Sequence, residues 1–491
     1  MQRTKIIATI GPASGEIGVL KKMVNAGMDA ARLNLSHNNY AYHQKVINNI
    51  RRVEAESKRP LPIILDLQGP KIRIGEIAGG RLEIKKGQNI ILVPEKKKIS
   101  FSSSTIYVPI QFTELYKHVK TGQTIYVDDA AIELKIIAAR KKRIECRAEN
   151  DGVIKSRKSL NVRGLKLKMP ILSAKDLADL EFGVKNKVDF IALSYVGSKA
   201  DLFKLRQAIG VLEKRFGYRS RDYQKPAEKG KWLKISTRII AKIEKPHAIK
   251  NFNEILETAD AVMVARGDLG LEIPIEDVPL IQKEIIAKCL TAAKPVIVAT
   301  QMLNSMISQP NPTRAEVSDV ANAVLDGADA IMLSGESAIG KYPVKSVRLM
   351  DKIARGVELT EVVKNQNDLI ASTITAAVTS VCKELAEQIN ARAIICVTTS
   401  GYTARSVSRL KLKQPIIALT PEVLTRRQLN ISWGVYPYIL KPAHSFDALA
   451  KTAINFVKKE KIVKPGDKVI IVAGHPVGYL GQSNLIKVEI I

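Results

Sequence analysis

The sequence predicts an α/β protein: a (β/α)₈ TIM barrel with an inserted all-β domain and a C-terminal open α/β domain. Eight short apolar runs rich in β-branched residues recur along the chain, and helical sequence separates most of them. Between the third and fourth runs, strands alternate with turn signals, and after about residue 356 strands alternate with helices again. A chain of 491 residues is long enough for two to four domains.

The eight runs are apolar throughout rather than alternating, as is typical of parallel strands covered on both faces. Segments 200–216 and 279–293 are apolar at helical spacing, and segment 313–327 opens with Thr313 and Glu316 in capping-box spacing. The runs lie at 5–11, 30–36, 62–69, 188–196, 236–245, 259–268, 294–302 and 328–336.

Three domains follow from this pattern. Residues 1–70 and 165–355 are expected to form the barrel, and residues 71–164 an inserted β-barrel domain. Residues 356–491 are expected to form a C-terminal α/β domain, whose last strand is an antiparallel edge strand because it follows a short loop.

The composition is that of a globular protein, with 46% hydrophobic residues and a formal net charge of +29. The basic runs are short, lack interleaved aromatics and match no nucleic-acid module, so a specific nucleic-acid partner is not expected. No apolar run is long enough to span a membrane, and the N-terminus lacks a signal-peptide pattern. A cytoplasmic location is therefore expected.

Polar residues gather where the predicted strands end. Active sites of such barrels lie at the carboxyl ends of the strands, so these side chains are expected to meet at one mouth. Six strand ends contribute: Arg32, Asn34 and Ser36, followed by His37; Asp66 and Gln68; Lys242 and Glu244; Arg266, Gly267 and Asp268; Thr300 and Gln301; Ser334, Gly335 and Glu336.

Lys242 and Glu244 are two residues apart in one strand, so they share a face. An isolated pair of this kind is usually a structural ion pair, but at the barrel mouth we interpret it as two arms around a ligand. Glu244 and Asp268, taken to lie on adjacent strands, offer hard oxygen ligands suited to Mg²⁺ or Mn²⁺. With Lys242, Arg32 and Arg73 supplying positive charge, the site suits phosphoryl transfer, and the chain has no P-loop.

The motifs resemble those of the pyruvate kinase family over essentially the whole chain. They include TKIIATIGPAS, ARLNLSH, IIAKIEK, VMVARGDLG, VIVATQML, PTRAEVSDVANAVLDGADAIMLSGESAIGKYP and TTSGYTAR. The resemblance implies that phosphoenolpyruvate and ADP give pyruvate and ATP, the final step of glycolysis, with an enolate intermediate. It also implies that the barrel is the catalytic domain, that residues 71–164 act as a lid, and that residues 356–491 serve regulation and oligomerisation.

The resemblance also implies residue roles. Lys242 would stabilise the transferring phosphoryl group, Arg32 would contact the phosphate, and Glu244 and Asp268 would hold the metal. Gly267 and Asp268 would bind the three-carbon acid, and Thr300, with Ser334, would assist protonation of the enolate. The implied nucleotide-side residues are Asn34, Ser36, His37, Arg73 and Lys158.

One departure concerns the monovalent cation. Many family members have DTKGPE where this chain has Asp66-Leu67-Gln68-Gly69-Pro70-Lys71, and the family's glutamate supports a bound K⁺. The Lys71 ammonium is expected to replace that ion, and Ile74 agrees with the K⁺-independent branch. The site or its replacement would comprise Asn34, Ser36, Asp66, Leu67 and Lys71, and activity without K⁺ is predicted.

The loop Thr398, Thr399, Ser400, Gly401, Tyr402 and Thr403 is rich in hydroxyls and precedes a helix. Such a loop can hold a phosphate, although it can also be an ordinary helix cap. The family uses it for phosphorylated effectors, so an allosteric site for a sugar phosphate or AMP is expected, and the family suggests a homotetramer. Another barrel enzyme acting on an enolate, such as an aldolase or lyase, and a non-catalytic metabolite or RNA binder are the alternatives.

Overall fold

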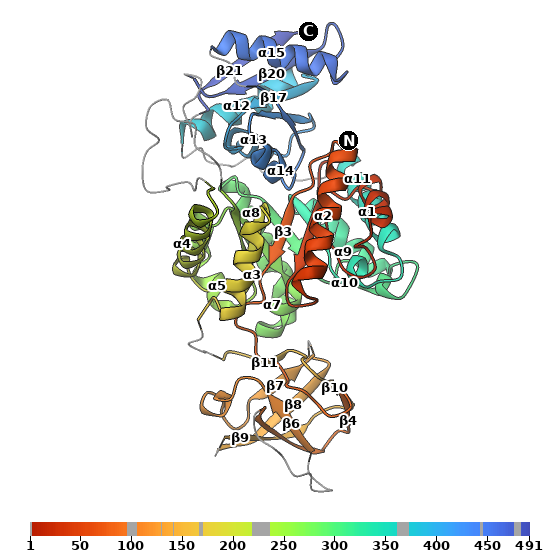
Figure 1. Ribbon diagram of the computed structural model, residues 1–491. Helices are drawn as coiled ribbons and strands as arrows, with labels where there is room; N and C mark the ends of the chain where they lie inside the picture. The colour runs from red at the N-terminus through yellow and green to blue at the C-terminus, as the bar shows by residue number, and fades with distance from the viewer. Residues whose placement is uncertain are drawn as a thin grey trace.

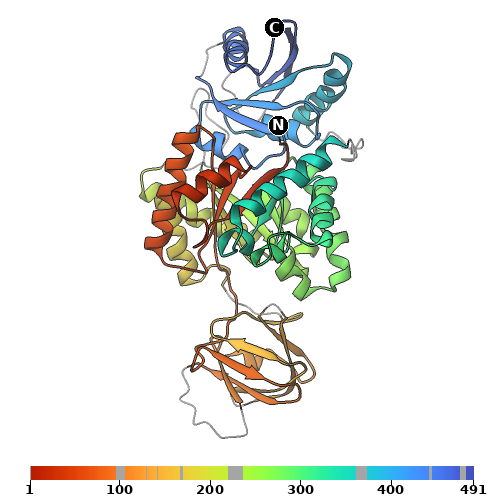
Figure 2. The same ribbon diagram turned by 90° about the vertical axis from the view of Figure 1, so that its right-hand side faces the viewer.

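The computed structural model describes residues 2–95, 106–128, 130–140, 142–165, 170–218, 236–360, 373–441, 445–475 and 483–491. Three bodies follow one another in space, and the barrel lies between the β insertion and the C-terminal sheet (Figure 1, Figure 2). In the described residues, no helix combines the length and apolar character needed to cross a bilayer.

The central body is a closed barrel of eight parallel strands in the order β1-β16-β15-β14-β13-β12-β3-β2, so the predicted fold class is confirmed. Most of the strand residues are buried, because the barrel lumen covers one face and the helices cover the other. The strands are β1 (Lys5–Thr9), β2 (Ala30–Asn34), β3 (Ile63–Asp66), β12 (Phe190–Leu193), β13 (Arg238–Ile243), β14 (Ala261–Ala265), β15 (Val296–Ala299) and β16 (Ala330–Leu333).

Helices surround the barrel, and their apolar faces pack on the outer side chains of the strands. The predicted capping box is present: Thr313 caps α9, and its side chain accepts from Glu316 N–H. The helices are α1 (Ile17–Asn25), α2 (Tyr40–Ser57), α3 (Ala174–Lys185), α4 (Lys199–Arg215), α5 (Pro246–Lys250), α6 (Phe252–Thr258), α7 (Arg266–Glu272), α8 (Val278–Thr291), α9 (Arg314–Leu325), α10 (Gly335–Ala338) and α11 (Pro343–Leu359), with short 3₁₀ turns at Ile275–Asp277 and Asn304–Ile307.

The barrel lumen is filled by side chains and is not a pore. Every second residue of a strand points inward, as with Phe190 and Ala192 of β12, and these residues form one apolar cluster. Ile431 of the C-terminal body belongs to the same cluster. Its neighbour Asn430 donates to Asp29 O, which precedes β2, so Ile431 closes the amino-terminal end of the barrel.

Two of the predicted strand runs end sooner than their sequences suggested. The run 259–268 stops at Ala265, and α7 begins at Arg266. The run 328–336 stops at Leu333, and α10 begins at Gly335. After β15 the chain turns sharply, because Thr300 and Gln301 both have left-handed backbones, with φ of 71° and 55°.

The insertion between β3 and α3 has its own apolar core. Its strands form a six-stranded sheet, β11-β7-β8-β9-β5-β6, and a two-stranded sheet, β10-β4. Among its described residues the helical structure is one 3₁₀ turn at Leu115–Lys117. The strands are β4 (Arg81–Ile84), β5 (Asn89–Pro94), β6 (Ile106–Ile110), β7 (Thr124–Val127), β8 (Ile132–Arg140), β9 (Arg143–Ala148), β10 (Gly152–Lys155) and β11 (Leu160–Val162).

The C-terminal body is an open sheet in the order β19-β18-β17-β20-β21 with an apolar cluster on each face. The prediction of an antiparallel last strand is confirmed, because β21 pairs antiparallel with β20 at the edge. The elements are α12 (Ile374–Gln388), β17 (Ala393–Val397), α13 (Tyr402–Ser408), β18 (Ile416–Thr420), α14 (Val423–Leu429), β19 (Val435–Ile439), α15 (Phe446–Lys459), β20 (Lys468–Ala473) and β21 (Leu485–Ile490).

Candidate active site

The polar site is a continuation of the apolar lumen. Inward-facing positions recur every two residues, so the series that fills the lumen runs on to the strand ends with the same orientation. On β13, Ile240 in the lumen cluster is followed by Lys242 and Glu244. The other strands give the parallel series Ala30, Arg32, Asn34; Ile64, Asp66, Gln68; and Phe190, Ala192, Ser194.

Lys242 lies at the centre of the site and is buried. Its Nζ lies 3.2 Å from Asp66 Oδ1 and 2.9 Å from Glu244 Oε1, and it donates to Ser194 Oγ at 2.8 Å. Burial opposes the charge of Lys242, but the carboxylates of Asp66 and Glu244 outweigh burial and raise its pKa. Lys242 and Glu244, interpreted from the sequence as two arms around a ligand, also contact each other directly as an ion pair.

Asp66 holds two cations in place. Its Oδ2 accepts from Arg32 Nε at 2.8 Å and lies 2.7 Å from Arg32 Nη2, while its Oδ1 faces Lys242. Burial acts to raise the pKa of Asp66, but Lys242 and Arg32 outweigh it and lower that pKa. Asp66 is thus an anion whose charge is used to fix the positions of Arg32 and Lys242.

Asp268 is not on a strand, as the sequence suggested, but in the first turn of α7. Its Oδ1 lies 2.7 Å from Lys71 Nζ. Burial acts to raise its pKa, yet Lys71 and Lys242 together lower it. Glu244 differs, because burial raises its pKa despite the neighbouring Lys242.

A cavity of about 200 Å³ joins most of the predicted site residues. Five Lys or Arg side chains and four Asp or Glu side chains line it, and burial, Arg73 and Arg32 lower the pKa of His37. The cavity therefore offers several cations to an anionic ligand. The predicted residues that line it are Arg32, Asn34, Ser36, His37, Asp66, Leu67, Lys71, Arg73, Lys158, Lys242, Glu244 and Asp268. Arg73 and Lys158 come from the β insertion, which therefore forms one wall.

Gly267, Thr300 and Ser334 do not line this cavity. Gly267 N–H donates to Thr300 Oγ1 at 2.7 Å, so these two residues form one unit beside Asp268. Ser334 precedes α10, and its N–H donates to the buried Glu336 at 2.7 Å.

Sequence reasoning missed the end of β12. Ser194 and Tyr195 line the cavity, as do Ser159 and Asp128 of the insertion. Asp128 pairs with Lys158 at 2.8 Å. Ser194 could have been found, because it continues the inward series of Phe190 and Ala192, whereas no sequence pattern singled out Tyr195.

The carboxylates Glu244 and Asp268 suit a divalent cation. Glu244 Oε1 is buried and has no well-aligned hydrogen bond, although Lys242 lies near it. Among the described residues no group of three or more His, Cys, Asp or Glu side chains could hold a metal. Two oxygen ligands from the protein, completed by water and substrate oxygens, are what Mg²⁺ commonly takes.

The loop of Thr398, Thr399, Ser400, Gly401, Tyr402 and Thr403 lies in the C-terminal body, and Gly401 (φ 80°) precedes α13. The loop is closed on itself, because Thr398 Oγ1 accepts from Gly401 N–H at 3.0 Å and Ser400 Oγ accepts from Tyr402 N–H at 3.4 Å. Arg238, the first residue of β13, donates to Ser400 O at 2.5 Å. The loop thus contacts the strand whose far end carries Lys242.

Comparisons with known proteins agree with this architecture. The family model described as pyruvate kinase, barrel domain, matches residues 1–347, and that described as pyruvate kinase, alpha/beta domain, matches residues 376–489. The chain is 40% identical to pyruvate kinase 2 from Synechocystis sp., over 100% of this chain and 79% of the relative. It is 38% identical to a pyruvate kinase from Clostridium acetobutylicum over the full length of both.

The crystal structure of a pyruvate kinase from Cryptosporidium parvum superposes with a TM-score of 0.87 and 34% identity, covering 100% of this chain and 96% of that one. Family models for both the barrel and the C-terminal body, full-length relatives and a closely similar structure lead to one assignment. The chain is a phosphotransferase of the pyruvate kinase family.

Proposed function

We propose that the chain uses Mg²⁺ or Mn²⁺ to transfer the phosphoryl group of phosphoenolpyruvate to ADP, giving pyruvate and ATP. The observation that carries this proposal is the buried Lys242, which lies between Asp66 and Glu244 in a cavity that four further Lys or Arg side chains line. Cations fixed beforehand at the place where charge spreads over the transferring oxygens are the main requirement of phosphoryl transfer.

The residues of the candidate active site are proposed to share the tasks of the reaction. Lys242 and Arg32 bind the phosphoryl group as its bond to the enolate oxygen breaks and its bond to the terminal ADP oxygen forms. Gly267 and Asp268 orient the three-carbon acid, and Thr300, with Ser334, assists delivery of a proton to the enolate carbon. Glu244 and Asp268 would hold the metal, which would neutralise charge on substrate oxygens.

The nucleotide is proposed to bind on the insertion side of the cavity. Asn34, Ser36, His37, Arg73 and Lys158 would contact it, supported by their common place in the cavity wall. The insertion would then act as a lid that excludes water.

Lys71 is proposed to replace the monovalent cation. The observation in support is its ammonium, 2.7 Å from Asp268 Oδ1, within the cavity that also contains Asn34, Ser36, Asp66 and Leu67. Activity in buffers without K⁺ is the expected result.

Regulation is proposed to act through residues 398–403. A sugar phosphate or AMP is the effector class that the resemblance suggests, and the contact from Arg238 to Ser400 offers a mechanical link to the barrel. Binding would require the phosphate to compete with the hydroxyls of Thr398 and Ser400 for the loop N–H groups. A homotetramer and a cytoplasmic location complete the proposal.

The test is a coupled assay that follows pyruvate formation from phosphoenolpyruvate and ADP with Mg²⁺ present. Pyruvate and ATP should form in equal amounts. An aldolase, a lyase or a non-catalytic binder would yield no ADP-dependent pyruvate, and that outcome would refute the proposal.

A further inference from the structure

Tyr195 stands at an unusual place in the chain, immediately after Ser194 at the end of β12. Its backbone is left-handed, with φ of 59°, which is uncommon for a bulky side chain and marks a position held by its surroundings. Gly69 packs closely on this turn: a Cβ at that position would lie 2.9 Å from Ser194 Cβ and 3.2 Å from Tyr195 Cδ2.

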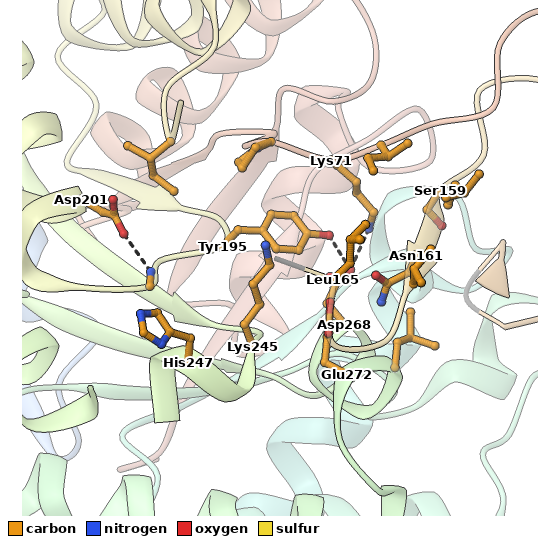
Figure 3. A pocket seen from close by; sticks show the side chains of 17 residues that line it. Lys71, Ser159, Asn161, Leu165, Tyr195, Asp201, Lys245, His247, Asp268 and Glu272 are labelled. Carbon is orange, nitrogen blue, oxygen red and sulfur yellow. Dashed lines mark hydrogen bonds and ion pairs between the residues drawn. The ribbon is translucent and has the colours of Figure 1, made fainter. Parts of the chain in front are cut away.

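The turn places Tyr195 in contact with both candidate metal-binding carboxylates. Its backbone N–H donates to Glu244 Oε2 at 2.7 Å, and its hydroxyl donates to Asp268 Oδ1 at 3.2 Å. Figure 3 shows the ring reaching across from the strand end, with its hydroxyl directed at the Lys71–Asp268 pair.

The ring itself is held between two lysines. Lys245 Nζ lies 4.6 Å from the ring centroid and Lys71 Nζ lies 6.0 Å from it, both within the range of cation–π contacts. Tyr195 lines both the 200 Å³ site and a second cavity of about 450 Å³ at the junction with the insertion, and Figure 3 shows the side chains around this second cavity. These contacts leave the hydroxyl little freedom to point elsewhere.

Each of the two carboxylates has one oxygen that Tyr195 does not contact, and these second oxygens are the ones that could bind a metal. Tyr195 engages Glu244 Oε2 and Asp268 Oδ1, whereas Glu244 Oε1 lacks an aligned hydrogen bond and faces the Lys242 ammonium at 2.9 Å. The contacts of Asp268 with Lys71 and Tyr195 are both made by Oδ1. Tyr195 thus binds one oxygen of each carboxylate and helps to fix the direction of the other.

We propose that Tyr195 is a positioning residue that aligns Glu244 and Asp268 for a divalent cation, with its hydroxyl acting through Asp268. The inference rests on the proposed metal site. Groups that orient metal ligands typically alter metal affinity by 10-fold or more, so the hydroxyl should be measurable through the metal alone.

The experiment measures Mn²⁺ binding to the full chain by electron paramagnetic resonance, without substrates. Tyr195→Phe keeps the ring, its cation–π contacts and the backbone N–H, and removes only the hydroxyl. We expect its Kd for Mn²⁺ to rise about 10-fold. Tyr436→Phe is the matched control, since Tyr436 also donates from a half-buried hydroxyl, to Gln2 O at 2.6 Å, and should leave the Kd unchanged.

Two further variants distinguish an error in the role of Tyr195 from an error in the proposed metal site. Glu244→Gln and Asp268→Asn should each weaken Mn²⁺ binding more than Tyr195→Phe does. If neither weakens it, the metal site itself is wrong; if both do and Tyr195→Phe stays within about 2-fold of the unmodified chain, only the role of Tyr195 is overturned. An equal loss in Tyr436→Phe would also overturn it, because the effect would then be one of general stability.

Discussion

Because Lys71 is proposed to replace the monovalent cation, replacing it with methionine should make activity depend on added K⁺. Lys71 Nζ lies 2.7 Å from Asp268 Oδ1, and two unit charges at that distance attract by about 6 kcal/mol at an effective dielectric constant of about 20. The two side chains are 21% and 25% exposed, so solvent reduces this to about 3 kcal/mol, similar to the usual cost of breaking a buried pair. If catalysis loses that amount, the rate falls about 100-fold.

The assay compares kcat/KM for Lys71→Met in tetraalkylammonium buffer and in KCl at an ionic strength of about 0.15 M. K⁺ can supply the missing charge, so it should restore at least about a tenth of the lost activity in the variant and change the unmodified enzyme little. Lys45→Met is the control, because Lys45 pairs with Glu16 at the same 2.7 Å but both side chains are exposed. An unmodified enzyme that needs K⁺, or a Lys71→Met variant that is fully active without it, would refute the reasoning.

Three other changes test the barrel and its ends. Lys242→Met should lower turnover about 10²–10³-fold in the coupled assay, because it removes a fixed cation from the site, and full activity in that variant would exclude the proposed role. Ile431→Ala should lower the free energy of unfolding in urea by about 3 kcal/mol, because it empties the buried end of the lumen, whereas the exposed Ile490→Ala should change it by less than about 0.5 kcal/mol. Burial lowers the pKa of Lys294 from 10.5 to about 8, so the unfolded chain binds this proton more tightly than the folded chain does. The free energy of unfolding in urea should therefore rise by about 2 kcal/mol between about pH 7.5 and 9.5, and an equal rise in Lys294→Met would contradict this.

The alternation of side chains along a strand explains how much of the site could be predicted. Arg32, Asp66, Lys242 and Glu244 continue inward series that are already apolar and buried in the lumen, so their common direction follows from the period of two. Ser194 also continues an inward series, but the sequence analysis did not select it because a single uncharged serine at a strand end is not a distinctive pattern.

Residues beyond the strand ends could not be placed in this way. Tyr195 and Thr300 both lie in left-handed turns, and Asp268 lies in a helix that begins within the predicted run. A change of backbone conformation at the strand end alters the direction of the next side chain. This conformation is fixed by packing against residues distant in the sequence, such as Gly69, so the local sequence does not specify it.

Helix α7 connects the chemistry to the proposed lid. Asp268 in its first turn is ion-paired with Lys71, which lies on the chain leaving the barrel for the insertion. Leu271 near its other end accepts a hydrogen bond at 3.3 Å from Arg163 Nε, which lies on the chain returning to the barrel. Residues 166–169, further along the returning chain, lie outside the described residues. Both connections to the insertion are thus bonded to one seven-residue helix, so we expect any movement of the proposed lid to shift the segment that carries Asp268.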